Sequence, residues 1–135
     1  MIPMDIADLL REALRHSGCV DSQIGHFDSH STIEMQMKNL PDISVAMVEG
    51  DVWVWAAVAE ASPNVMNHCA FELMQFLLEG NAYSRTGQLH LCVVQERLEL
   101  RLMANAHATG DAEHFAQALD GFVQATETLC ELLRR

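Results

Sequence analysis

Basic residues are scarce in this chain, and their scarcity excludes several classes of partner. The 135 residues include 8 Lys and Arg against 19 Asp and Glu, which gives a formal net charge of −11. Nucleic acids and anionic membranes present phosphate groups, and the proteins that bind them need surfaces rich in Lys and Arg. We therefore expect no nucleic acid among its partners. The acidic surface instead suits a soluble protein that attracts basic segments.

Long apolar segments are also missing. No apolar run approaches the roughly 18 residues of a membrane helix. Residues 1–20 carry Asp5, Asp8 and Glu12, which the apolar core of a secretory signal would not tolerate. The cysteines are widely spaced and form no C-x-x-C pair: Cys19, Cys69, Cys92 and Cys130. We expect reduced thiols, no membrane insertion and a cytoplasmic location.

The chain has no Gly/Ser/Pro-rich linker, low-complexity tract or internal repeat. Half of the residues are hydrophobic and 20% are charged, which argues against disorder. A chain of 135 residues suits one domain with a real core. We therefore predict a single domain over residues 1–135.

Hydrophobic periodicity in the first half predicts one helix and three strands. A helix over 5–15 follows from apolar residues at i, i+3 and i+4, with Asp5 as its N-cap. Apolar residues then alternate with polar ones over 33–37 and 43–47, as in half-buried strands. Glu49-Gly50 predicts a tight turn into a strand over 52–58 that is apolar on both sides, as if covered twice.

The second half predicts two helices around two more strands. Ser62-Pro63 begins a helix that runs to about Glu79, with Gly80 after its end. Strands follow over 89–93 and 98–102, and a last helix covers 111–133. Gln95-Glu96 lacks the Gly or Asn of a tight hairpin, which leaves the pairing of those two strands open. The predicted fold class is α+β, in the order α-β-β-β-α-β-β-α, with helices packed on a mostly antiparallel twisted sheet.

Several short motifs carry letters of catalytic or metal sites, but none is complete. His26, Asp28 and His30 form H-x-D-x-H with Cys19 upstream, and no second ligand pair stands at zinc-finger spacing. Asp28-Ser29-His30 has the letters of a hydrolase triad, which three consecutive residues cannot align. His90 and Cys92 share one face of a strand, a pair more typical of packing or surface than of catalysis. We expect no enzyme, metal or cofactor.

Methionine and tryptophan allow two interpretations each. The chain has 8 Met, which either fill irregular gaps in a core or line an adaptable groove for several partners. Trp53 and Trp55 share one face of a strand. We expect them to anchor the core, with a partner-facing role as the alternative.

Six short motifs in register resemble one family: the multi-effector, class IB chaperones of bacterial type III secretion, in particular the invasion-system branch. The motifs cover nearly the whole chain: Ser17-Gly18-Cys19, Asp28-Ser29-His30-Ser31-Thr32-Ile33, Leu40-Pro41-Asp42-Ile43, Asp51-Val52-Trp53-Val54-Trp55-Ala56, Gly87-Gln88-Leu89-His90-Leu91, and Gly110-Asp111 leading to Gly121-Phe122. The resemblance implies a cytosolic homodimer that holds N-terminal segments of effector proteins extended, soluble and ready for export. It further implies delivery to the secretion apparatus and contact with its ATPase. The alternative is a small α+β adaptor or dimerisation module of another cytosolic assembly.

Two sets of residues are candidates for these contacts. The helix over 62–79 is apolar around most of its girth, which indicates a second partner. The predicted dimer interface comprises Met66, Leu73, Phe76, Leu77, Leu89 and Leu91. The predicted effector-binding groove comprises Ile6, Leu10, Leu14, Ile33, Met35, Met37, Val45 and Met47.

Overall fold

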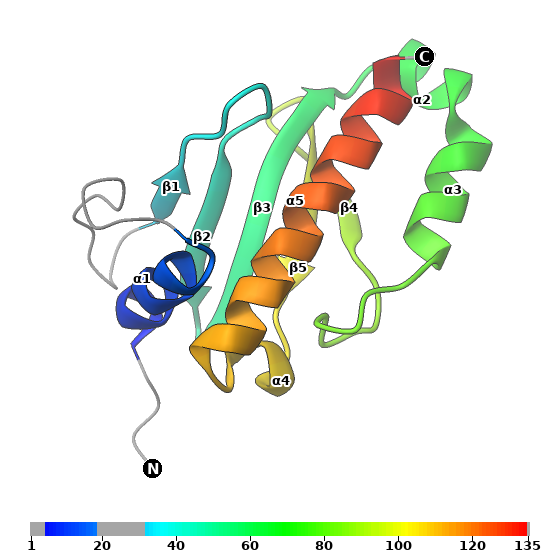
Figure 1. Cartoon of the computed structure of the whole chain (residues 1–135). Helices are drawn as coiled ribbons and strands as arrows, with labels where there is room; N and C mark the ends of the chain where they lie inside the picture. Colours follow the sequence, from blue (N-terminus) through cyan, green and yellow to red (C-terminus); the bar gives the residue numbers. More distant parts are fainter. Residues whose placement is uncertain (1–4, 19–31, 135) are drawn as a thin grey trace.

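A computed structural model describes residues 5–18 and 32–134 and shows a five-stranded sheet with helices packed against it (Figure 1). The elements run α1 (Ile6–His16), β1 (Ile33–Met35), β2 (Ile43–Val48), β3 (Asp51–Glu60), α2 (Pro63–His68), α3 (Ala70–Leu78), β4 (His90–Val94), β5 (Arg97–Met103), α4 (Ala106–Thr109) and α5 (Ala112–Arg134). The strand order is β1-β2-β3-β5-β4, and every neighbouring pair is antiparallel. The predicted α+β class is confirmed.

The sheet is a meander followed by a hairpin. Val48 pairs with Asp51 across the two-residue turn Glu49-Gly50, and both turn residues have positive φ, 53° and 85°. Val94 pairs with Arg97 across Gln95-Glu96, whose φ values of 49° and 65° are also positive. Left-handed backbone at non-glycine residues costs about 1–2 kcal/mol each. The last two strands therefore form a tight hairpin in spite of their turn sequence.

One face of the sheet and the helices enclose the core. Alternate residues of β3 (Val52, Val54, Ala56) and of β5 (Leu98, Leu100, Leu102) are buried on that face. The long helix α5 lies along β3 and adds Phe115, Phe122 and Leu129, all fully buried. The helix α1 packs beside α5 (Figure 1). The described helices therefore form a single layer on one face of the sheet.

The opposite face of the sheet carries Trp53 and Trp55, and none of the described helices lies on it (Figure 1). Both indoles are half-buried, and neither belongs to the core cluster. The predictions that β3 is covered twice and that these residues anchor the core were therefore wrong. A run that is apolar on both sides does not distinguish a second covering layer from an exposed aromatic face.

The middle helical segment differs from the single helix predicted over 62–79. It breaks at Cys69, whose φ of −133° is outside the helical range, into α2 and α3. The Cys69 thiol donates a hydrogen bond to the Val65 carbonyl at 3.2 Å, and the Cys69 carbonyl accepts from Leu73 N at 2.8 Å. The short helix α4, capped by Asn105, was also missed. The break lets α3 leave the line of α2 and stand away from the sheet (Figure 1).

Candidate binding surfaces

The helix α3 is apolar on the side that faces solvent. Leu73 is its one residue described as buried, at 8% exposed. Phe71, Met74 and Leu78 are 63%, 54% and 67% exposed. Three large apolar side chains on nine residues of helix form a patch that a monomer leaves in water, and such patches are typical of protein interfaces.

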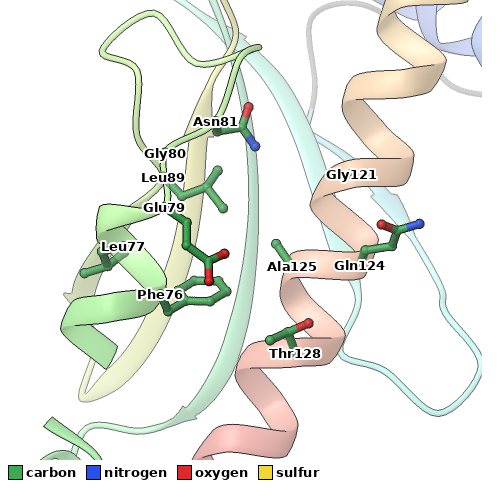
Figure 2. A pocket seen from close by; sticks show the side chains of 10 residues that line it. All are labelled: Phe76, Leu77, Glu79, Gly80, Asn81, Leu89, Gly121, Gln124, Ala125 and Thr128. Atoms are coloured by element: carbon green, nitrogen blue, oxygen red, sulfur yellow. The ribbon is translucent and has the colours of Figure 1, made fainter. Parts of the chain in front are cut away.

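A groove of about 240 Å³ separates α3 from α5 (Figure 2). Phe76 and Leu77 line it from α3, and Leu89 lines it from the segment that precedes β4. Gly121 and Ala125 of α5 line the opposite wall, where the lack of a side chain at Gly121 and the single methyl group of Ala125 leave the space open. The groove and the outer patch therefore leave most of the apolar surface of α3 uncovered by its own chain.

The six predicted dimer-interface residues fall into two groups. Leu73 and Leu89 are both 8% exposed, so they are mostly occupied within one chain. Met66, Phe76, Leu77 and Leu91 are half-buried and keep surface for a partner. The predicted interface did not include Phe71, Met74 and Leu78, which the structure shows to be exposed. Their positions outside the buried stripe of the helix could have indicated this exposure from the sequence. Dimer contact by any of these residues stays a prediction.

The eight predicted groove residues divide in the same way. Ile6, Leu10, Ile33 and Val45 are at most 5% exposed and belong to the core. They have no surface of their own to offer a client, because their side chains fill the space between helix and sheet. Leu14, Met35 and Met37 are half-buried and packed against that core, and Met47 is 45% exposed. These four remain candidates.

The strand β1 lies at one edge of the sheet. Among the described residues it pairs only with β2, through Ile33–Val45, Glu34–Ser44 and Met35–Ile43. An edge strand presents unpaired N–H and C=O groups on its outer side, which an extended peptide can use. Met35 lies on this strand and Met37 lies two residues after its end, and both are partly exposed, so main-chain and side-chain contacts are available together.

The uncovered face of the sheet holds a cluster of aromatic and charged groups. The Arg101 guanidinium carbon lies 5.4 Å from the ring centroid of Trp53 and 5.3 Å from that of Trp55. Arg101 Nε lies 3.2 Å from Glu99 Oε1, and His90 meets Trp53 edge-on at 6.4 Å. Buried Glu99 Oε1 accepts no hydrogen bond of acceptable geometry from the residues that the structure describes.

The described residues do not assemble a reactive constellation. Burial raises the pKa of the Cys69 thiol, and nearby Glu72 raises it further. Burial also raises the pKa of Cys130, against a smaller lowering by Arg134. Thiols with raised pKa are poor nucleophiles. His90 Nε2 lies 2.8 Å from the Thr86 hydroxyl.

No metal-ligand cluster of three or more groups exists within the described ranges 5–18 and 32–134. The H-x-D-x-H motif and Cys19 lie outside those ranges. Of the helices that the structure describes, none has the length and apolar character that a membrane crossing requires.

Comparisons with known proteins fit this architecture. Residues 18–95 match the model of the invasion protein B family. The chain is 38% identical over 132 residues to the surface presentation of antigens protein SpaK of Salmonella typhimurium, with 98% of each chain covered.

Two solved structures share the fold at low sequence identity. The first is the ExsC–ExsE complex, with a TM-score of 0.65 at 14% identity over 98% of this chain and 97% of that one. The second is the heterodimeric ExoU–SpcU complex from the type III secretion system of Pseudomonas aeruginosa, with a TM-score of 0.56 at 17% identity over 90% and 91%. The resemblance predicted from six short motifs is thus confirmed by the family match, and the chain belongs to the invasion protein B family.

Proposed function

We propose that this protein is a cytosolic type III secretion chaperone that binds N-terminal segments of effector proteins and keeps them export-competent. The observation that carries the proposal is the outer edge of β1, which pairs only with β2 among the described residues, together with the partly exposed side chains of Met35 and Met37 on and after it and of Leu14 in α1. Strand addition at an edge supplies main-chain hydrogen bonds that are independent of client sequence, while pockets for alternate side chains supply selectivity. Family membership supports the same function.

The chemistry of this surface suits several clients. Methionine is unbranched and polarisable, so Met35, Met37 and Met47 can repack around different apolar side chains. A client held as an added strand is extended and lacks a core of its own. Such a segment is suited to threading through a narrow conduit, and the complex needs no nucleotide to form.

A homodimer through α3 is part of the proposal. The exposed Phe71, Met74 and Leu78 offer an apolar surface for a second copy, next to the groove lined by Phe76 and Leu77 (Figure 2). In a two-fold dimer each copy would contribute the same patch. Delivery of the client to the ATPase of the secretion apparatus, as the resemblance implies, would complete the function.

Co-expression with effectors of the same secretion system tests the proposal. The tagged chain should retain an N-terminal effector fragment that survives limited proteolysis as a complex. The double variant Met35→Ala/Met37→Ala should weaken retention on the order of tenfold, since truncating buried apolar contacts costs about 1 kcal/mol or more each. Met103→Ala is the matched control, because Met103 lies on the other face of the sheet. Retention of no effector, at protein concentrations in the micromolar range, would contradict the function.

A further inference from the structure

A hollow of about 440 Å³ opens on the uncovered face of the sheet, next to β1. Its lining residues come from the first three strands, from β5 and from the turn between β1 and β2: Glu34, Leu40, Pro41, Asp42, Ser44, Trp55, Ala57, Arg97 and Glu99. We infer that this hollow, called here the Trp55 pocket, takes one arginine or lysine side chain of a bound client. The inference rests on the proposed chaperone function and names a chemical requirement of its clients.

The strand register explains why a hollow forms at this place. Glu34 pairs with Ser44, Ser44 pairs with Trp55, and Trp55 pairs with Arg101, so these four side chains form one row on the same face. In the next row Ala57 pairs with Glu99. The small side chains of Ser44 and Ala57 lie among larger neighbours, so the sheet is depressed there with an indole beside the depression.

Charge selects a cation as the occupant. The lining carries three carboxylates, those of Glu34, Asp42 and Glu99, against one guanidinium, that of Arg97. Glu34 and Asp42 are exposed, whereas the Glu99 side chain is 13% exposed and engages Arg101. An indole face attracts cations in addition to the carboxylates, as the position of Arg101 over Trp55 already illustrates.

The position of the pocket connects it to the proposed client edge. Glu34 belongs to β1, and a client strand added to β1 would lie one strand spacing, about 4.8 Å, further out. Alternate client side chains would then point to the helix side, near Met35, and to the uncovered side, near Glu34. The long aliphatic stem of Arg or Lys can reach back across β1 and bring its charge to the Trp55 pocket. The expected client pattern is an apolar residue on each side of a basic one.

The test uses two synthetic peptides, Ac-Leu-Arg-Leu-NH2 and its neutral counterpart with citrulline in place of arginine. The chain has 2 Trp, so its two indole N–H signals in a ¹⁵N NMR spectrum are assigned with a Trp53→Phe variant. We expect the arginine peptide to shift the Trp55 signal saturably and to bind on the order of tenfold more tightly than the citrulline peptide. This readout needs no effector, so failure of the pocket and failure of the chaperone function are separate results.

Two charge-matched variants decide where the cation binds. Glu34→Gln/Asp42→Asn should abolish the preference for arginine over citrulline. Glu127→Gln/Glu131→Gln removes two exposed carboxylates from α5 and should leave the preference intact. Equal binding of the two peptides, no shift of the Trp55 signal, or an equal loss in both variants would overturn the inference, the last by assigning the effect to the net charge of −11.

Discussion

The helices α1 and α3 have similar lengths, 11 and 9 residues, but they differ in which side chains they expose to solvent. In α1 the apolar residues Ile6, Leu9 and Leu10 are at most 3% exposed. Its outer side carries charged residues, with Arg11 Nη1 2.9 Å from Asp8 Oδ1. In α3 only Leu73 is described as buried, and the outer side carries large apolar groups.

This difference shows which helix buries its apolar side chains within one chain and which does not. Most of the apolar stripe of α1 is buried in the core beside α5, with Leu14 half-buried at its end. In α3, Phe71, Met74 and Leu78 stay exposed within one chain, as is typical of residues at protein interfaces. Leucine is therefore buried in one helix, as at Leu9 and Leu10, and exposed in the other, as at Leu78.

A cavity in α1 should produce the largest effect on stability. Leu10 is fully buried, and Leu10→Ala should lower the free energy of unfolding by about 4 kcal/mol, because the fold cannot collapse fully around the missing atoms. Chemical denaturation followed by circular dichroism measures the loss. Glu12→Ala on the outer side of the same helix should change the value by no more than about 0.5 kcal/mol. Similar losses in both variants would refute the assignment of α1 to the core.

A polar substitution on the outer side of α3 should act on assembly and spare the fold. Leu78→Ser removes apolar surface from both copies of a dimer and should weaken it on the order of a hundredfold, equivalent to about 2.7 kcal/mol. Sedimentation velocity across a dilution series measures the dissociation constant. Gln75→Ser, at an exposed polar position of the same helix, is the control and should leave the dimer unchanged. A wild-type chain that sediments as a monomer at micromolar concentration would rule the interface out.

Client affinity should respond to methionine truncation more than to salt. Met37→Ala should weaken the binding of different clients unequally, because each client packs differently. The loss should be about 1 kcal/mol for a client whose apolar side chain packs against Met37. Raising salt from about 0.05 to 0.5 M should leave most of the affinity, since screening acts on long-range steering and on one cation site. Isothermal titration at both salt concentrations makes the comparison. A hundredfold loss on raising salt would show that electrostatics holds the client.

The smallest effect concerns the start of α5, where Asp111 accepts hydrogen bonds from the backbone N and from Nδ1 of His114, each at 2.8 Å. The bond from the backbone, followed by the one from the ring, lowers the pKa of Asp111 from its ordinary value of 3.8. The stabilisation is therefore present above that value and is lost as pH falls through the lower pKa of the folded state. Thermal unfolding between pH 2 and 6 should show a slightly shallower acid dependence for Asp111→Asn than for the wild type. Identical profiles would mean that this cap contributes nothing.

Much of the fold was predictable because the periodic segments face one covering layer. Helical spacing over residues 5–15 reflects a boundary between core and water, whereas in β2 all of 43–46 are buried and Met47 is exposed, so the alternation located this strand without giving its burial. The break at Cys69 was not predictable, since no Gly or internal Pro marks it. The Gln95-Glu96 hairpin also escaped prediction, because strand pairing outweighed the local preference of those residues.

For the candidate sites, the sequence predicted the segments involved but not the individual residues that stay exposed. The apolar excess of residues 62–79 was readable from the sequence, but which side of the helix stays open depends on the stand-off of α3 from α5 (Figure 2). Half of the predicted groove residues are core, because a pattern that repeats every second residue does not reveal where covering helices end. The Trp55 pocket depends on five segments and on cross-strand register, which no local pattern encodes.

We propose that clients bind at β1 and that a second copy binds at α3, and hydrogen exchange of the free and client-bound protein tests this separation. Both samples should contain the protein well above its dimer dissociation constant, with an effector fragment recovered by co-purification as the client. Client binding should slow exchange in β1 and the two residues after it, 33–37, and should leave α3, 70–78, unchanged. Slower exchange confined to α3, with none at β1, would contradict this proposal.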